Sequence, residues 1–232
     1  MSFHVAVIPD GNRRWAKMHE LPIMAGHKKG SDVLRQLVEK IMELKIDCFT
    51  FWGASISNLT KRPSEEIYFL DKLFVEQFRA LAKSEIVHKH QIRVRVLGFW
   101  PSLLSEEAKQ SIEEAVEVTA IHKHGMLNFL IAYDGIEEMV QAIQALVEET
   151  RKDVYAVITR EMVKGRLLTK DLPPVDLLIR TGGEPHLSAG FMMWDVADAQ
   201  MVFLKKFWPD FTSEDLEEAV ADFRGRERRF GV

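Results

Sequence analysis

Short apolar runs alternate with amphipathic helical patterns along almost the whole chain. Apolar runs typical of buried strands occupy residues 5–8, 48–52, 93–97, 126–132, 175–179 and, more weakly, 201–203. Between them, apolar residues recur at helical spacing over residues 28–45, 64–87, 105–121, 136–150, 159–165 and from residue 213 onward. Strands separated by helices are joined by right-handed crossovers, so the pattern predicts an α/β fold with a mostly parallel sheet flanked by helices.

No linker-like stretch and no internal repeat interrupts this alternation, which predicts that residues 1–232 form a single domain. A chain of 232 residues is long enough to bury a substantial core. The helical segment 64–87 carries Phe69, Phe74 and Phe78. We expect this helix to pack on the sheet and part of its aromatic face to line an apolar channel, together with Gly53.

Composition and charge narrow the class of protein. With 47% hydrophobic and 28% charged residues, the chain is typical of a soluble globular protein rather than a collagen-like or disordered one. Lys and Arg number 31 against 35 Asp and Glu, and this acidic balance argues against a nucleic-acid partner. The single cysteine, Cys48, excludes an intrachain disulfide, and we expect it to be buried. No membrane-spanning run or signal peptide is recognisable, which predicts a cytoplasmic protein.

Polar, glycine-rich clusters follow three of the predicted strands, at residues 10–14, 55–58 and 180–184. Ligands of open parallel sheets bind outside the carboxyl ends of the strands. We therefore expect the three clusters to converge on one face and to form the binding site there.

The first cluster joins a carboxylate, a glycine and two guanidinium groups. Gly11 permits a close backbone approach, and Arg13 and Arg14 can bind phosphate in a bidentate manner. Asp10 beside phosphates makes sense if it holds a divalent cation such as Mg²⁺. The alternative is that Asp10 caps a helix and the arginines are solvated.

The cluster at residues 180–184 repeats this chemistry with an arginine, a hydroxyl and two glycines, and residues 224–231 add further cations. The C-terminal cations could equally be a solvated basic tail that balances a helix C-terminus. Two anion-binding turns on one face indicate two phosphorylated ligands side by side.

The same clusters, in this order along nearly the whole chain, resemble the motifs of the cis-prenyltransferase family, typified by undecaprenyl diphosphate synthase. The matching segments are residues 4–16, 26–30, 55–66, 176–184, 208–211 and 226–231. The resemblance implies a six-stranded parallel sheet with an apolar tunnel and a homodimer. It also implies Mg²⁺-dependent transfer of an allylic prenyl group from a prenyl diphosphate to isopentenyl diphosphate, with a new Z double bond and release of pyrophosphate. Peripheral contact with a membrane through the lipid product is a further implication.

The resemblance assigns roles to individual residues. Asp10 matches the catalytic aspartate that supports Mg²⁺ and diphosphate departure, and Asn58 matches a residue implicated in positioning or deprotonation. The positions matching the donor diphosphate site are Gly11, Asn12, Arg13, Arg14, His27 and Arg62. The positions matching the acceptor site are Arg180, Ser188 and, reaching into the partner subunit, Arg229 and Gly231; His186 stands there in place of a second arginine.

The chain also departs from the family pattern. Gln200 takes the place of an acidic residue that helps to hold the metal, although Asp195 and Asp198 are near it in sequence, and the segment before Trp194 is one residue longer than usual. Ile23 stands where the donor site often has an arginine, and Ser57 replaces a common glutamate.

These departures leave three readings. In the first, His186, Asp195 or Asp198 compensates for the missing arginine and the missing acidic residue, and standard elongation with isopentenyl diphosphate proceeds. In the second, the acceptor is different, such as another prenyl diphosphate or a prenyl alcohol. A third reading is a non-catalytic partner subunit of a heteromeric enzyme. The presence of Asp10, Arg14 and Arg180 favours a catalyst over this last interpretation.

Overall fold

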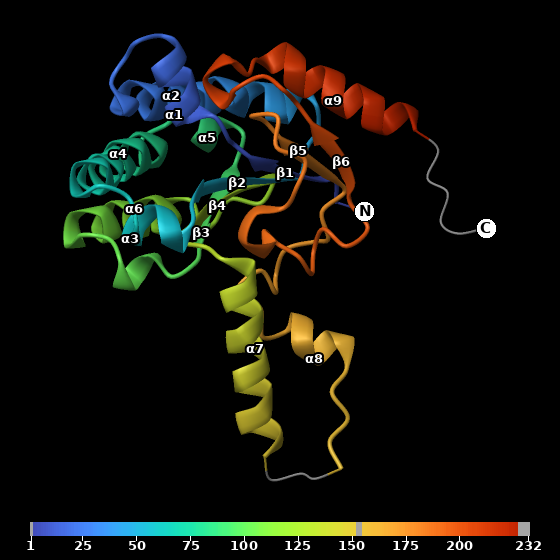
Figure 1. The fold of residues 1–232 in the computed structure, drawn as a ribbon. Coiled ribbons are helices and arrows are strands. Elements are labelled where there is room, and N and C mark those ends of the chain that lie inside the picture. Colours follow the sequence, from blue (N-terminus) through green and yellow to red (C-terminus); the bar gives the residue numbers. More distant parts are fainter. Residues whose placement is uncertain (1, 152–154, 227–232) are drawn as a thin grey trace.

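Six parallel strands form one sheet at the centre of the molecule, which we describe from a computed structural model for residues 2–151 and 155–226 (Figure 1). Their spatial order is β3-β4-β2-β1-β5-β6. The strands are β1 (His4–Ile8), β2 (Cys48–Ala54), β3 (Ile92–Leu97), β4 (Gly125–Ile131), β5 (Leu177–Arg180) and β6 (Gln200–Phe203). The predicted parallel α/β sheet is confirmed.

Helices cover the sheet unequally. The helices are α1 (Asn12–Met18), α2 (Ile23–Glu43), α3 (Ile56–Thr60), α4 (Ser64–Ala82), α5 (Glu85–Lys89), α6 (Glu106–Val118), α7 (Gly135–Thr150), α8 (Arg160–Lys164) and α9 (Ser213–Gly225). The larger core cluster joins one face of the sheet to α2, α4, α6 and α9. A smaller cluster on the other face includes the segment after β5, and α7 and α8 extend away from the body (Figure 1).

Three elements differ from the sequence prediction. Helix α2 begins at Ile23, five residues earlier than expected, because its first turns present Gly26 and His27 rather than an apolar stripe. The helix predicted over residues 64–87 is two helices, since Ser84 accepts a hydrogen bond from the backbone of Val87 (3.4 Å) and caps α5. The polar loop after β2 contains the short helix α3.

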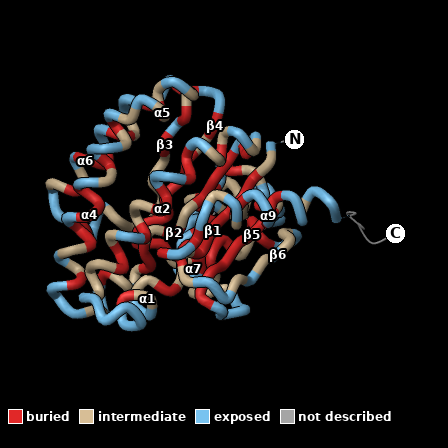
Figure 2. Tube along the Cα trace, turned by 90° about the horizontal axis from the view of Figure 1, so that it is seen from above, coloured by how far each residue is buried: buried red, intermediate tan, exposed pale blue. Residues whose placement is uncertain are grey.

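Strand β2 separates the two core clusters by alternating its side chains. Phe49 and Phe51 face α2 and α4, whereas Cys48 and Trp52 face the smaller cluster. Figure 2 shows that the central strands are mostly buried, and β1 is buried at every residue. Burial raises the pKa of the Cys48 thiol to about 12, so this cysteine is a small core side chain that stays protonated at neutral pH. None of the helices in the described part of the chain has the length and hydropathy that a bilayer crossing requires.

His4 ties β1 to its surroundings as a neutral, fully buried imidazole. Its Nδ1 donates to the Pro173 carbonyl (2.8 Å), and its Nε2 accepts from the hydroxyl of Thr50 (2.8 Å). Burial lowers the pKa of His4 to about 4. Since the ordinary value is about 6.5, the unfolded chain takes up a proton on His4 at a higher pH than the folded chain does.

The free energy of unfolding should therefore fall as the pH drops from about 6.5 to about 4. The His4 contribution to this loss is up to about 3 kcal/mol. Denaturant titrations at several pH values test this by comparing wild type with His4→Gln, which should lack this part of the slope. The exposed His124→Gln should keep the wild-type slope. Equal slopes in wild type and His4→Gln would contradict the prediction.

Candidate active site

The strand ends bring the three predicted polar clusters together. Strands β2, β1 and β5 are neighbours in the sheet, and their carboxyl ends carry Asn58, Asp10 and Arg180. All three residues line one cavity of about 520 Å³. The expected convergence on one face is therefore observed.

Asp10 lies at the centre of a charged triad. Its Oδ2 accepts from Arg180 Nη2 (2.9 Å), and its Oδ1 is 3.1 Å from Arg14 Nη2. The helix that follows, α1, has Gly11 as its N-cap residue and no side-chain cap. The alternative in which Asp10 only caps a helix is therefore wrong, because both carboxylate oxygens face guanidinium groups.

Two glycines allow this close approach. Gly11 has φ +110°, and a Cβ there would lie 2.6 Å from Phe207. Gly182 has φ +89°, and a Cβ there would lie 2.7 Å from Arg14 Nη2 and 3.1 Å from Asp10 Cβ. Both positions combine a left-handed backbone with crowding, so a side chain at either would displace the Asp10 cluster.

His27 and Arg62 are held by a buried carboxylate that the sequence analysis did not single out as functional. Glu66, 2% exposed, accepts on its Oε1 from His27 Nε2 (2.9 Å) and from Arg62 Nη1 (2.7 Å). Burial lowers the pKa of His27, so the imidazole is neutral and donates its Nε2–H. Arg13 Nε lies 3.8 Å from the second oxygen of Glu66. Glu66 therefore orients three of the predicted donor-site residues.

A second cleft, of about 680 Å³, opens beside this cluster. It contains all six residues predicted for the donor diphosphate, and Ile23 as well. Lys17, one helical turn after Arg13, also lines the cleft and supplies a cation that the sequence analysis missed. Its signal was the spacing on α1, which places Lys17 and Arg13 on the same helix face.

The predicted acceptor residues gather around Arg180, which is only 3% exposed. Arg180 Nη1 donates to Ser188 Oγ (2.8 Å) and to the backbone carbonyl of His186. The exposed His186 ring lies 3.3 Å from Ser188 Oγ. The other two predicted acceptor residues, Arg229 and Gly231, lie outside the described residues.

The lengthened segment after Ser188 is strongly bent. Ala189 (φ 45°), Gly190 (φ 58°) and Met192 (φ 44°) all have left-handed backbone conformations. Such conformations cost about 1 kcal/mol or more for residues other than glycine, so packing must hold the loop. The fully buried Phe191 and Met192 provide that packing in the smaller core cluster.

The acidic residues considered as substitutes for the missing metal ligand do not reach the site. Asp195 is buried and pairs with Lys164, and it accepts from Thr169 Oγ1 (2.6 Å). Gln200 pairs with Leu177 at the start of β6, about 10 Å along the strand from the level of Arg180. Asp198 is exposed. The idea that Asp195 replaces a carboxylate at the metal is therefore wrong for this chain's own site.

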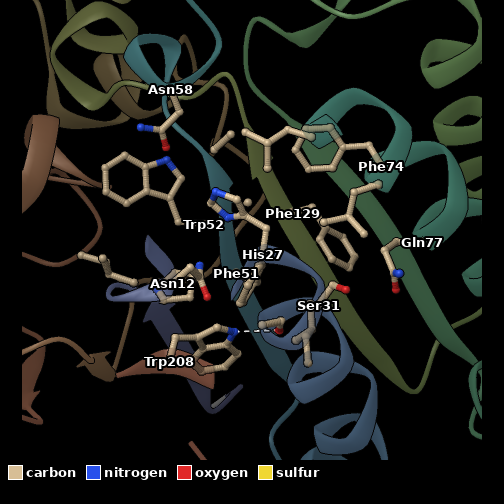
Figure 3. Close-up of a pocket in the computed structure, with 18 of the residues that line it drawn as sticks. Asn12, His27, Ser31, Phe51, Trp52, Asn58, Phe74, Gln77, Phe129 and Trp208 are labelled. Atoms are coloured by element: carbon tan, nitrogen blue, oxygen red, sulfur yellow. Dashed lines mark hydrogen bonds between the residues drawn. The ribbon is translucent and has the colours of Figure 1, made fainter. Parts of the chain in front are cut away.

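Away from the Asp10 and Arg180 cluster, the cavity of about 520 Å³ is mainly apolar, with Ser31, Gln77 and Ser84 as polar lining residues. Phe74 of α4 lines it with Phe51 and Phe129 of the sheet (Figure 3), and Phe78 of α4 is a further lining residue. Gly53 lies at its wall, as expected. Phe69 was expected there as well, but it is not among the lining residues, because it lies on another side of α4.

The described part of the site offers few side chains that could bind a metal ion. In the part of the chain that the structure describes, no three His, Cys, Asp or Glu side chains are grouped to hold a metal ion. Asp10 is the acidic residue that lines both cavities. Mg²⁺ is commonly held by one or two carboxylates together with substrate phosphates and water, so Asp10 fits a cation that arrives with a diphosphate.

The fold and site define a protein that binds anionic groups at the ends of parallel strands, beside an apolar cavity. Comparison with known proteins specifies the class. Residues 8–231 match the prenyltransferase family model described as undecaprenyl diphosphate synthase. The chain is 40% identical over 98% of its length to the ditrans,polycis-undecaprenyl-diphosphate synthase ((2E,6E)-farnesyl-diphosphate specific) of Vibrio vulnificus, covering 90% of that protein.

Another relative and a solved structure point to the same family. The tritrans,polycis-undecaprenyl-diphosphate synthase (geranylgeranyl-diphosphate specific) of Pyrococcus furiosus is 38% identical over 98% of this chain and 86% of its own length. The crystal structure of lavandulyl diphosphate synthase from Lavandula x intermedia in complex with dimethylallyl diphosphate superposes with a TM-score of 0.89. Its identity is 28%, and the match covers 99% of this chain and 98% of that chain. The chain therefore belongs to the undecaprenyl diphosphate synthase family of cis-prenyltransferases.

Proposed function

We propose that this protein transfers an allylic prenyl group from a prenyl diphosphate to isopentenyl diphosphate. The C1–O bond of the donor breaks, pyrophosphate leaves, and C1 bonds to the terminal methylene carbon of the acceptor. A proton is then lost from C2 of the acceptor, which leaves a Z double bond. The single observation that supports this most is Asp10, held between Arg14 and Arg180 where two anion sites and one apolar cavity meet.

The donor diphosphate is proposed to bind in the cleft formed by α1, Arg62 and His27. The neutral His27 and the cationic Arg62 are held by Glu66, so they bind phosphate without a large loss of side-chain entropy. Arg13, Arg14 and the α1 amides stabilise the negative charge that develops on pyrophosphate as the C1–O bond breaks. Mg²⁺ bound by Asp10 would neutralise part of the same charge.

The acceptor is proposed to bind at Arg180 and Ser188. Asn58 lines the same cavity, but its Oδ1 already accepts from the backbone N–H of Ser55 (3.2 Å). Its NH₂ group is then the part that can contact a substrate. A neutral amide is a poor base, so we assign Asn58 to positioning rather than to deprotonation. The apolar part of the cavity holds the growing chain and keeps water from the reacting carbon.

The decisive experiment is product analysis with purified protein, Mg²⁺ and labelled isopentenyl diphosphate. Allylic donors of graded length include farnesyl and geranylgeranyl diphosphate, the donors named for two relatives. We expect labelled Z-prenyl products from at least one donor. The absence of product with every donor would contradict the proposal and would favour a non-catalytic partner subunit.

An altered acceptor is a second candidate, and the acceptor loop favours it. His186 presents only its carbonyl to Arg180, and the loop after Ser188 is rebuilt around left-handed residues. A second prenyl diphosphate or a prenyl alcohol as the sole acceptor provides the test. Faster turnover with either than with isopentenyl diphosphate would support the altered acceptor, and efficient long Z-chains from isopentenyl diphosphate would exclude it.

We also propose that two copies of the chain form a homodimer through α7. One face of α7 exposes four apolar side chains at helical spacing, called here the α7 stripe: Ile136 (56%), Val140 (42%), Ile143 (51%) and Val147 (53%). The stripe begins beside the acceptor loop, because a Cβ at Gly135 would lie 1.9 Å from the Gly190 carbonyl oxygen. A second copy on the stripe would therefore lie next to the acceptor site.

Val140→Asp should convert the dimer to a monomer, because it places a charge in the middle of the stripe. Sedimentation velocity at micromolar concentration measures the change. Val118→Asp on α6 is the matched control, since Val118 is equally exposed (41%) but lies outside the stripe. A monomeric wild type, or a Val140→Asp variant that stays dimeric, would refute this interface.

A further inference from the structure

One buried polar group that lines the cavity beside Asp10 finds no partner in the described part of the chain. The indole nitrogen of Trp52 has no hydrogen-bond partner among the described residues, although Trp52 is only 9% exposed. Trp52 lines the cavity of about 520 Å³. A buried N–H without a partner is costly in a folded protein, and a bound ligand that accepts the hydrogen bond removes that cost.

Trp52 lies on the acceptor side of the sheet. It follows Phe51 on β2 and points to the opposite face, where its ring packs on Phe191 with centroids 5.1 Å apart. Ala189, which follows the acceptor residue Ser188, packs on the same cluster. Glu66, which holds the predicted donor residues His27 and Arg62, comes from α4. This helix covers the other face of the sheet.

Several N–H donors surround the same part of the cavity. Arg180 is 3% exposed, and its Nε has no partner among the described residues. In the view of Figure 3 the indole nitrogen of Trp52 is on the edge that points toward Asn58, and both residues line the same cavity. The Asn58 oxygen accepts from Ser55, and both oxygens of Asp10 face arginines. The Trp52 indole N–H and the Arg180 Nε–H are thus two buried donors that no described residue accepts from, and unpartnered N–H donors are the chemistry of an anion site.

We propose that the indole N–H of Trp52 donates a hydrogen bond to a diphosphate oxygen of the acceptor, beside Arg180. This inference rests on the proposed function, because it assigns one more binding residue to the acceptor site. Trp52 contributes where His186 has left the site without a second arginine side chain. Its aromatic ring also forms an apolar floor for the short hydrocarbon part of the acceptor.

Trp52→Phe tests the hydrogen bond, because it removes the N–H and keeps an aromatic ring. We expect the KM for isopentenyl diphosphate to rise about tenfold, since a hydrogen bond to a charged group is lost. The donor KM and kcat should stay within about twofold. Trp100→Phe is the control: it makes the same change at a tryptophan that lines neither of the two cavities, and the acceptor KM should stay unchanged. Equal rises in both KM values of Trp52→Phe, or the same kinetic change in Trp100→Phe, would overturn the proposal.

A second measurement does not depend on turnover. The donor site is filled with a non-reacting prenyl thiodiphosphate, and inorganic pyrophosphate is added while indole N–H signals are followed by NMR. The signal that is absent from Trp52→Phe should move downfield as pyrophosphate binds. A signal that stays in place while calorimetry reports bound pyrophosphate would overturn the inference, even if the enzyme elongates prenyl chains. A moving signal in a protein that makes no product would support the Trp52 contact and contradict the proposed reaction.

Discussion

Asp10→Asn should reduce turnover by a factor of about 100 to 1,000, which is the usual effect of removing one preorganised electrostatic group from an active site. The substitution keeps the shape of the side chain but removes the charge that faces Arg14 and Arg180. It also removes the carboxylate proposed for Mg²⁺. Steady-state kinetics at saturating Mg²⁺ and saturating substrates give the change in kcat.

A matched surface variant separates catalysis from general charge effects. Asp32→Asn removes a carboxylate of similar exposure, 35% against 32% for Asp10, that also faces two cations, Lys28 and Arg35. It should leave kcat within about twofold, because exposed ion pairs contribute little. Turnover of Asp10→Asn within threefold of wild type, in protein that shows a normal thermal transition, would contradict the proposed role of Asp10.

Gly26→Ala should destabilise the protein by roughly 2–4 kcal/mol through overpacking. Gly26 lies in α2 where this helix crosses α1, and a Cβ there would lie 2.1 Å from the backbone oxygen of Asn12. Backbone cannot move aside as a flexible side chain can, so the two helices must separate. Because α1 carries Arg13 and Arg14 and α2 carries His27, donor binding should weaken as well. Denaturant unfolding gives the free energy, and the donor KM reports the site.

Gly225→Ala is the control for this variant. Gly225 also lies in a helix, α9, but nothing approaches within 4 Å of a Cβ placed there. Alanine in a helix is about 0.5–1 kcal/mol better than glycine where there is room, so this variant should be as stable as wild type or slightly more stable. If Gly26→Ala behaved like Gly225→Ala, the close contact between α1 and α2 would not be a constraint on the fold.

Much of the fold could be predicted from the sequence because its signals are local. An apolar run such as residues 5–8, followed by a polar glycine-rich turn, identifies a buried strand and its functional end without any knowledge of distant residues. Elements without such a signal were missed or displaced. The first turns of α2 face the site with Gly26 and His27, and α3 is held by a capping box between Ser55 and Asn58.

Site residues were predicted where their signal lies in neighbouring residues, and they were missed where their role depends on residues far away in the sequence. Asp10, Asn58 and Arg180 were found because each follows a strand, and parallel strands end at one edge. Glu66 has no recognisable role in sequence, since its partners His27 and Arg62 come from α2 and from the turn before α4. Its function depends on how two helices pack against each other.

The sequence by itself determined that this chain forms a parallel α/β sheet with anion-binding turns at the ends of its strands. Periodicity and turn chemistry are properties of neighbouring residues, so they can be read without coordinates. Only the tertiary structure decided the strand order, the burial of Asp195 against Lys164 and the place of Gln200 at the start of β6. It also decided that the buried indole N–H of Trp52 has no partner among the described residues. Each of these depends on which distant groups meet, and that is decided by the packing of the whole chain.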